Sequence, residues 1–512
     1  MSASREKKAR QELHASGYVD PKAVKAEEAR KAAKRSSILY GSIAALFVLV
    51  AAFIIVWNSG LIQKSATAVT IDGESYSVAE TGYFYQYAYN QWYSQMGAYA
   101  SYFGLDTTAP LSSQIYDEET GETWADYFAS EGIASMKWTI AAYNAAQESG
   151  YEWSDEDEES WNSTKTSLEE YAKANGVSYK NILKYNYGKY ITPSLFEKLT
   201  RMQITALGYA QTISDGFSFT TDEIAKNYDE NPLDYDIADY ELVTVSGTPD
   251  SKDADGNDIE VTDEMKEEAM AAAKVNAEAI LAAYEAGTSL EDAAENEEYK
   301  ATYSDRADSS YSDTDVLNWV FDDARTEGDT TIIESDSSYS VVLFHSRGRE
   351  EYNTVDMRHI LVKVDSSDLD SESETYDADL EERKAAAKAE ADELLKQWKD
   401  GEKTEASFGA LADEHSDDGA EGGLYTAVAK GDMVAEFNDW IFADGRKTGD
   451  VDVIYSESTN GYHVMYFVGE NVPCWQADSE YDLRTAAYNE WSETLVADMT
   501  AEEGSGMKYV KN

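Results

Sequence analysis

The sequence has little cysteine, proline and histidine for its length: its 512 residues include one Cys, six Pro and five His. A disulfide needs two cysteines, so the single Cys474 excludes an internal disulfide, and packing alone must hold the fold together. We expect Cys474 to be a small packed side chain. A run similar to a calcium loop, residues 253–258, lacks the Glu required at the twelfth position, where Thr262 stands. The sequence therefore predicts no metal site and no cofactor.

Positive charge is also scarce, with 42 Lys and Arg against 99 Asp and Glu, and a formal net charge of −57. The imbalance is uneven, because residues 1–57 carry ten basic and five acidic residues, whereas the remainder carries 32 and 94. A polyanion of that size repels the phosphates of nucleic acids and the headgroups of anionic lipids. Nucleic acid is therefore excluded as a partner, and basic partners are favoured.

One long apolar run is present, at residues 38–57, and it contains no charged residue. A helix of that length, rising about 1.5 Å per residue, crosses a hydrocarbon core of about 30 Å. Basic residues precede it at positions 30, 31, 34 and 35. This predicts a basic cytoplasmic tail (1–36), a single transmembrane helix (37–58) and an extracytoplasmic remainder, so the protein would lie in the cell membrane. The alternative is a cleaved signal peptide ending near Ala66-Thr67-Ala68, but the long basic region before the run favours an anchor.

Residues 66–234 show helical periodicity and predict an α-helical lobe. We interpret residues 150–160 as an acidic connection, Gly216 as the end of the main block, and Thr221 as the N-cap of a last short helix. Three segments carry the pattern, and the first of them is rich in aromatic residues: 83–103, 124–147 and 193–213.

The sequence contains an internal repeat at an offset of 121 residues, which predicts two tandem α+β domains, at 235–350 and 353–471. In the aligned first copy, Tyr240 stands for His359 and Ser340 for His463, so we expect that copy to be degenerate and non-catalytic. The repeated residues are Trp319, Phe321, Arg325, Gly328 and Asp329, which recur as Trp440, Phe442, Arg446, Gly449 and Asp450.

The last part of the chain, residues 475–512, has an apolar residue at every fourth position from Leu483 to Met499. That spacing places one apolar stripe on a helix. We expect this C-terminal helix to return to the helical lobe and pack on it.

The second copy carries two histidines in strand-like surroundings. His359 lies in the run Arg-His-Ile-Leu-Val, and His463 lies in the run Gly-Tyr-His-Val-Met. Between them come a helical pattern at 407–412, the pair Gly422-Gly423, and a run that begins at Gly431. This series closely resembles the parvulin family of peptidyl-prolyl isomerases.

The resemblance implies that His359 and His463 face each other as a hydrogen-bonded catalytic pair, with Asp418 in an electrostatic role beside the substrate carbonyl. Ser458 is a candidate partner that sets the tautomers across the hairpin. The alternative is that the two histidines are buried core residues whose hydrogen bonds are satisfied, and that the apolar residues assigned to a proline-binding cup are core residues as well. The residues that the resemblance assigns to the proline cup are Leu424, Met433 and Phe437.

The exported part, residues 66–512, resembles PrsA/SurA-type foldases in its domain order. Together with the transmembrane helix expected at 37–58, this implies a membrane-anchored extracytoplasmic foldase that binds unfolded or newly exported proteins and isomerises their X–Pro bonds. The acidic stretch at 365–377 would repel a phosphorylated substrate, so we expect no phospho-specificity. Two alternatives remain: a non-catalytic holdase whose parvulin domains are structural, and a sugar-binding ectodomain. The second draws on 11 Trp and 37 Tyr, but we find no carboxylate pair at glycosidase spacing.

Overall fold

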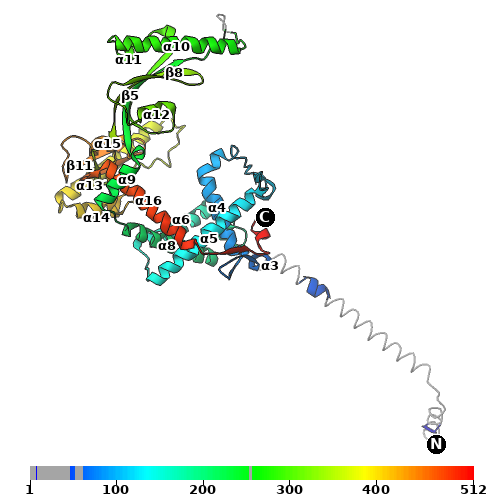
Figure 1. The fold of residues 1–512 in the computed structure, drawn as a ribbon. Helices are drawn as coiled ribbons and strands as arrows, with labels where there is room; N and C mark the ends of the chain where they lie inside the picture. Colours follow the sequence, from blue (N-terminus) through cyan, green and yellow to red (C-terminus); the bar gives the residue numbers. More distant parts are fainter. Residues whose placement is uncertain (1–6, 9–45, 52–60, 253–256, 512) are drawn as a thin grey trace. The chain divides into compact units, whose positions relative to one another are not determined.

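The computed structural model describes residues 7–8, 46–51, 61–252 and 257–511 (Figure 1). The tail and the transmembrane segment expected before residue 59 lie outside the described residues, apart from the first two of these ranges. Among the residues that the structure does describe, no helix is both long and apolar enough to cross a membrane.

The chain divides into two compact units. Unit 1 joins the residues up to Gly216 to those from Tyr488 onward, and unit 2 comprises Phe217–Ala487. Each unit has its own hydrophobic core, and we describe each separately.

Unit 1 is mainly helical, and Phe128 lies at the centre of its aromatic core. The ring of Phe128 lies 5.2 Å from Tyr89, 5.9 Å from Trp92 and 5.6 Å from Trp124, measured between ring centroids. Such tilted and edge-to-face pairs stabilise a core beyond the area that they bury. The helices are α3 (Leu61–Ser65), α4 (Val78–Met96), α5 (Trp124–Ser149), α6 (Asp155–Ala174), α7 (Tyr179–Tyr187) and α8 (Pro193–Gly216), with the 3-10 turns η1 (Gly97–Tyr99) and η2 (Leu111–Ser113).

The acidic residues at 150–160, expected to form a connection, begin helix α6 instead. Ser154 caps this helix: the Asp157 backbone N–H donates to Ser154 Oγ at 3.1 Å, and the Ser154 N–H donates to Asp157 Oδ2 at 3.0 Å. The acidic first turn also stabilises the positive end of the helix dipole. Periodicity missed α6 because only Asp157, Trp161 and Ala172 are buried along its 20 residues.

A three-stranded antiparallel sheet, in the order β13-β1-β2, joins the two chain segments of unit 1. Its strands are β1 (Thr67–Ile71), β2 (Glu74–Ser77) and β13 (Ala501–Glu503), and Val69 lies opposite Glu503. The preceding helix α16 (Cys474–Val496) ends earlier than expected, so Met499 lies beyond it and packs against the unit 1 core. The sequence missed β13 because three exposed residues carry no apolar pattern. A short hairpin, β3 (Ile115–Asp117) and β4 (Glu122–Thr123), also belongs to unit 1.

Unit 2 holds two four-stranded antiparallel sheets with equivalent strand orders, β6-β5-β8-β7 and β10-β9-β12-β11 (Figure 1). The mixed α+β class predicted from the sequence is thereby confirmed. The first sheet is formed by β5 (Asp236–Ser246), β6 (Ala301–Ser310), β7 (Thr330–Glu334) and β8 (Ser338–Arg349). The second is formed by β9 (Asn353–Lys363), β10 (Leu424–Val428), β11 (Val451–Ser456) and β12 (Gly461–Pro473).

The helices of unit 2 repeat as well, because a long helix packs on one face of each sheet: α10 (Asp263–Glu285) on the first and α13 (Tyr376–Asp400) on the second. The first helix of the unit, α9 (Thr221–Glu230), is capped by Thr220 and not by Thr221, because Thr220 accepts from the Glu223 N–H. The shorter helices are α11 (Leu290–Ala294), α12 (Asp315–Val320), α14 (Glu405–His415) and α15 (Ala435–Ile441).

The strand register corrects one residue of the predicted alignment between the copies. The Gly328 N–H donates to the Phe344 carbonyl at 2.9 Å, and the Gly449 N–H donates to the Phe467 carbonyl at the same distance, so the two phenylalanines are equivalent. Phe344 lies opposite Tyr240, and Phe467 lies opposite Met357. Tyr240 therefore corresponds to Met357, and the residue in the place of His359 is Leu242. A shift of two residues keeps every side chain on the same face, so residue patterns could not detect it.

Candidate functional site

The two histidines come from the two central strands of the second sheet. In the register of β9 and β12, His359 lies opposite Met465 and His463 lies opposite Leu361, so the imidazoles are diagonal neighbours on one face. Their Nδ1 atoms are 3.1 Å apart. Both side chains are buried, with 4% of His359 and 1% of His463 exposed. The structure thus brings the predicted pair together in hydrogen-bonding contact.

Asp418 reaches this pair because the loop before it is tied along β9. The Leu361 N–H donates to Ser416 Oγ at 3.0 Å, and the Lys363 N–H donates to Asp417 Oδ2 at 2.8 Å. With the loop held at these two points, Asp418 Oδ2 lies 2.9 Å from His359 Nε2. The predicted acidic residue is therefore in direct contact with the first histidine.

The pair Gly422-Gly423 allows the chain to enter β10 close to the histidine strand. Both residues have left-handed φ angles, +56° and +62°, which cost a non-glycine residue conformational energy. A Cβ on Gly423 would also lie 2.0 Å from the His359 carbonyl oxygen. Arg358 holds the turn from the other side, with its Nη1 donating to the Gly422 carbonyl at 2.8 Å.

With His359 neutral, the hydrogen bonds around the histidines have one consistent direction. An ionised Asp418 can only accept, so His359 Nε2 must carry a proton and donate to it. A neutral His359 then accepts at Nδ1, so His463 donates from Nδ1 and accepts at Nε2. Thr459 Oγ1 lies 2.8 Å from that Nε2 and donates to it. The chain runs from Thr459 through His463 and His359 to Asp418, which also accepts from the Tyr425 hydroxyl at 2.8 Å.

The pKa shifts of these groups agree with that assignment. Burial lowers the pKa of His359 below its ordinary value, against the opposing effect of Asp418. Burial, followed by the neighbouring His359, lowers the pKa of His463 to about 3. Burial alone would raise the pKa of Asp418, but the hydrogen bond from Tyr425 and the interactions with His359 hold it below its ordinary value. Burial and the bond to Asp418 raise the pKa of Tyr425 to about 12. At pH 7 the site therefore holds two neutral imidazoles, an ionised carboxylate and a protonated phenol.

An apolar wall borders the imidazoles. The Phe437 ring lies 5.2 Å from the His359 ring and 4.6 Å from the His463 ring, and Met433 packs into the same cluster. Tyr425 also belongs to this wall, with its ring 5.3 Å from that of His359. The arrangement combines an apolar surface with polar groups of fixed protonation and contains no activated nucleophile.

Two predicted residues are placed elsewhere. Leu424 lies opposite Arg358 in the register and lines a hollow beside α14, whereas its neighbour Tyr425 faces the histidines, because successive strand residues point to opposite faces. Ser458 hydrogen-bonds to Ser456 Oγ at 2.9 Å, so the partner of His463 is Thr459 instead. Within the described residues, no group of three or more His, Cys, Asp or Glu side chains is arranged to hold a metal ion.

Residues 339–470 match the family described as the PPIC-type PPIase domain. This part of the chain is a parvulin-type domain. The matched range begins in β8, ahead of the predicted limit at 353, and it contains the histidine pair, Asp418 and the apolar wall.

Solved structures similar to this chain include two of PrsA and one of SurA-like chaperones. PrsA of Bacillus subtilis has 14% sequence identity, with 76% of this chain and 87% of that chain covered and a TM-score of 0.28. PrsA of Bacillus cereus has 15% identity, with 63% and 95% covered and a TM-score of 0.19. The SurA-like chaperones of Campylobacter jejuni give 11% identity, with 65% and 96% covered and a TM-score of 0.15. These TM-scores are too low to support a conclusion about the whole chain. No curated protein matches the sequence.

The first sheet of unit 2 lacks the polar groups of the parvulin domain. Leu242 and Ser340 occupy the places of His359 and His463, and Val316 corresponds to Phe437 in the repeat. The equivalent face is filled by an apolar cluster that includes Tyr240 and Leu242. The first copy thus keeps the sheet and loses the imidazole pair.

Sequence reasoning missed Thr459 and Tyr425. Strand alternation could have found Tyr425, because only one of two adjacent residues in β10 can face the histidines. Thr459 carried no such signal, since its hydroxyl reaches His463 through the conformation of the turn after β11.

Proposed function

We propose that this protein is an extracytoplasmic foldase that catalyses the cis/trans isomerisation of X–Pro bonds in unfolded exported proteins. The observation that carries the proposal is the buried, neutral pair His359 and His463, joined to Asp418 and bordered by Phe437 within a PPIC-type domain. The residue types fit this chemistry because isomerisation needs no nucleophile.

The barrier to rotation is about 18–20 kcal/mol and comes from amide resonance. A catalyst lowers it by binding the twisted amide better than either planar form. Phe437 and Met433 supply an apolar surface against which a proline ring packs and water is excluded. The hydrogen bonds to Asp418 orient this side chain and hold its negative charge close to the imidazoles.

Unphosphorylated substrates fit the site better than phosphorylated ones. The loop that follows β9 contains five carboxylates: Asp365, Asp368, Asp370, Glu372 and Glu374. Arg383, which contacts this loop, already pairs with Asp368 at 2.9 Å. A phosphate carries about −1.5 to −2 charge at pH 7, so these carboxylates would repel it. A phosphoserine–proline peptide should therefore be isomerised more slowly than the same peptide without phosphate.

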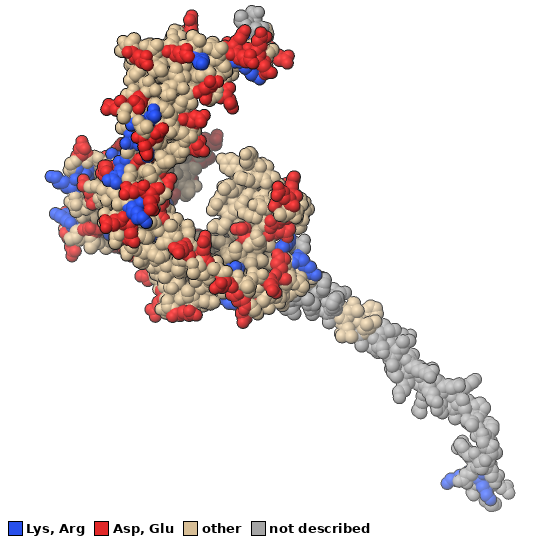
Figure 2. All heavy atoms as spheres, viewed as in Figure 1, with Lys and Arg blue, Asp and Glu red and all other residues tan. Residues whose placement is uncertain are grey.

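A second candidate function, holding clients without catalysis, is favoured by one surface in unit 1. Residues 81–105 contain no charged side chain. The end of α4 and the segment after it expose large apolar side chains, with exposed fractions from 38% to 86%, over a surface that shows few charged groups in Figure 2. Exposed apolar patches of this kind mark interaction sites. We call this surface the aromatic platform; it consists of Tyr93, Met96, Tyr99, Tyr102 and Phe103.

The two functions separate in one experiment with a client protein whose refolding is limited by proline isomerisation. The foldase proposal predicts that the full-length protein accelerates the slow refolding phase and that His463→Ala abolishes the acceleration. The holdase predicts suppressed aggregation without acceleration, and that Tyr99→Ser/Tyr102→Ser removes this suppression. Tyr185→Ser, at a tyrosine that is 80% exposed outside the platform, is the matched control.

We further propose that residues 37–58 anchor the protein in the cell membrane with the N-terminus in the cytoplasm. The support is the uncharged run at 38–57 and the basic residues that precede it. An intact N-terminus on protein extracted from membranes would support the anchor. A mature chain that starts near Val69 would contradict it.

A further inference from the structure

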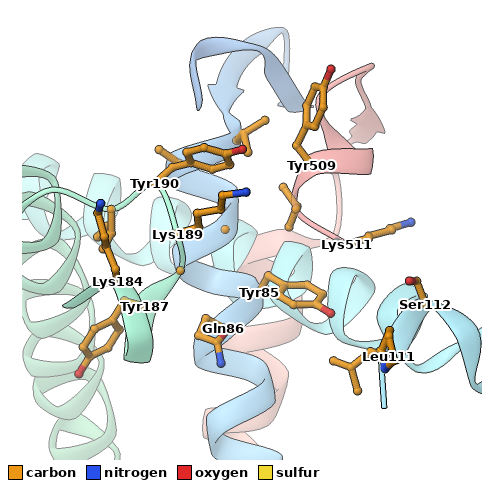
Figure 3. A pocket seen from close by; sticks show the side chains of 17 residues that line it. Tyr85, Gln86, Leu111, Ser112, Lys184, Tyr187, Lys189, Tyr190, Tyr509 and Lys511 are labelled. Carbon is orange, nitrogen blue, oxygen red and sulfur yellow. The ribbon is translucent and has the colours of Figure 1, made fainter. Parts of the chain in front are cut away.

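A cavity of about 400 Å³ lies in unit 1 beside α4, within the size range of small-ligand sites (Figure 3). Its walls come from α4, from the turn η2, from the end of α7 with the segment that follows it, and from the residues around Val510. Apolar and aromatic side chains form most of its lining, among them Val78, Leu111, Ile191 and Tyr190. It is therefore suited to receive an apolar side chain.

Cationic side chains also contribute to the lining of this cavity. Lys184, Lys189 and Lys511 line it. Lys511 is already paired with Asp126 and Glu503, at 2.9 Å from each. For Lys184 and Lys189, no carboxylate of the described residues lies within 4.0 Å. Figure 3 shows Lys189 alongside Tyr190, and the Lys189 Nζ lies 5.4 Å from the centroid of that ring.

The surrounding sequence reinforces this local charge. Residues 171–196 contain four lysines and no Asp or Glu, in a chain that has 99 acidic residues. An anionic group is therefore favoured at this cavity. The strong negative charge of the rest of the protein opposes a long polyanion, whereas a single carboxylate meets little of that repulsion.

We propose that this cavity binds a short peptide segment of a client that carries a carboxylate next to an apolar side chain. The apolar side chain packs against Leu111 and Ile191, and the carboxylate pairs with Lys189. The carboxylate comes either from the end of the client chain or from an Asp or Glu side chain. The inference relies on the proposed function only for the nature of the client.

The test is fluorescence-anisotropy binding of labelled tetrapeptides to the full-length protein. The first peptide is Ala-Ala-Phe-Leu with a free carboxylate, the second is its amide, and the third is the amide of Ala-Ala-Glu-Leu. We expect the first peptide to bind and its amide to bind up to about fivefold more weakly, the upper range of one exposed ion pair. Equal binding of the third and first peptides would show that a carboxylate from either source is accepted, and binding of the first alone would assign the carboxylate to the chain end.

Variants locate the contact. Lys189→Met should weaken binding of the free-acid peptide to the level of its amide. Lys180→Met is the matched control, because Lys180 is an exposed lysine on α7, the helix before Lys189, and does not line the cavity. An equal loss of affinity for the free-acid peptide in the two variants would overturn the proposal. The proposal would also be overturned if the free-acid peptide and its amide bound equally, if the free-acid peptide did not bind, or if tripolyphosphate displaced that peptide completely. Prolyl exchange by the same wild-type sample is a separate readout, so failure of the cavity and failure of the isomerase are distinguishable.

Discussion

Asp418 requires a proton on His359 Nε2, because an ionised carboxylate accepts hydrogen bonds and donates none. When His359 is also neutral, as its lowered pKa favours, each ring nitrogen of His359 and His463 has a single role, and Thr459 completes the chain. A proton added at His359 Nδ1 would set two N–H groups against each other across 3.1 Å. Unless His463 moves its own proton from Nδ1 to Nε2, the pair therefore stays neutral, and burial, which lowers the pKa of both histidines, favours this state.

Thr459→Val should reduce prolyl exchange severalfold, because it leaves a buried acceptor on His463 without a donor, at a cost of about 1–3 kcal/mol. The free Nε2 can then take the proton that His463 shares with His359. Thr459→Ser keeps the hydroxyl and should restore exchange. The imidazole ¹⁵N shifts would report the tautomer directly, and an unchanged tautomer in the valine variant would show that Thr459 does not position the pair.

Stability of the parvulin domain should fall as the solution is acidified. In the folded state the pKa of His463 is about 3, whereas its ordinary value is 6.5, so below pH 6.5 the unfolded chain binds more protons. The contribution is fully present above pH 6.5 and is lost as the pH falls towards 3, at roughly 1.4 kcal/mol per pH unit for each such histidine. Urea unfolding monitored by tryptophan fluorescence, compared with His463→Gln, measures it. A variant with the same pH slope as wild type would contradict the low pKa.

At the scale of single elements, the site depends on two segments that pack closely against strand β9. The turn at Gly422-Gly423 brings β10 against β9, and the loop at 416–418 runs along the same strand. The glycine pair and Asp418 belong to a recognisable motif, so the sequence could predict them. The side on which Leu424 and Tyr425 point depends on where the strand begins, which the motif does not specify.

Gly423→Ala should destabilise the parvulin domain by more than about 2 kcal/mol, because it combines a left-handed φ with a methyl group 2.0 Å from the His359 carbonyl. Gly419→Ala is the matched control in the same loop, since a Cβ there meets nothing within 4 Å. Chemical unfolding of the two variants measures the difference. Equal stability would mean that β10 does not approach β9 as closely as described.

For the whole molecule, the sequence predicted two copies of one α+β fold and a helical lobe, because repeated residues and apolar periodicity persist over long segments. It failed where tertiary contacts decide the structure. The pairing of β13 with β1 depends on backbone groups of exposed residues, and the capped acidic start of α6 has almost no apolar pattern. The register of the first copy also required the observed hydrogen bonds of Gly328 and Gly449.

Ser340→Ala should leave prolyl exchange unchanged. Ser340 occupies the place of His463 in a sheet that has Leu242 in the place of His359, so this sheet has no imidazole pair. His463→Ala, the equivalent change in the second sheet, should abolish exchange. The pair of variants assigns activity to one copy. A loss of exchange in folded Ser340→Ala would show that the first copy takes part in the reaction.

The most direct test of the central claim is exchange spectroscopy of unphosphorylated X–Pro peptides with the full-length protein and with His359→Ala/His463→Ala. Circular dichroism would verify that the double variant is folded. The account predicts rapid cis/trans exchange with wild type and a rate close to the uncatalysed one with the variant. Equal exchange in the two proteins, or none from folded wild type, would contradict the assignment of isomerase activity to the histidine pair.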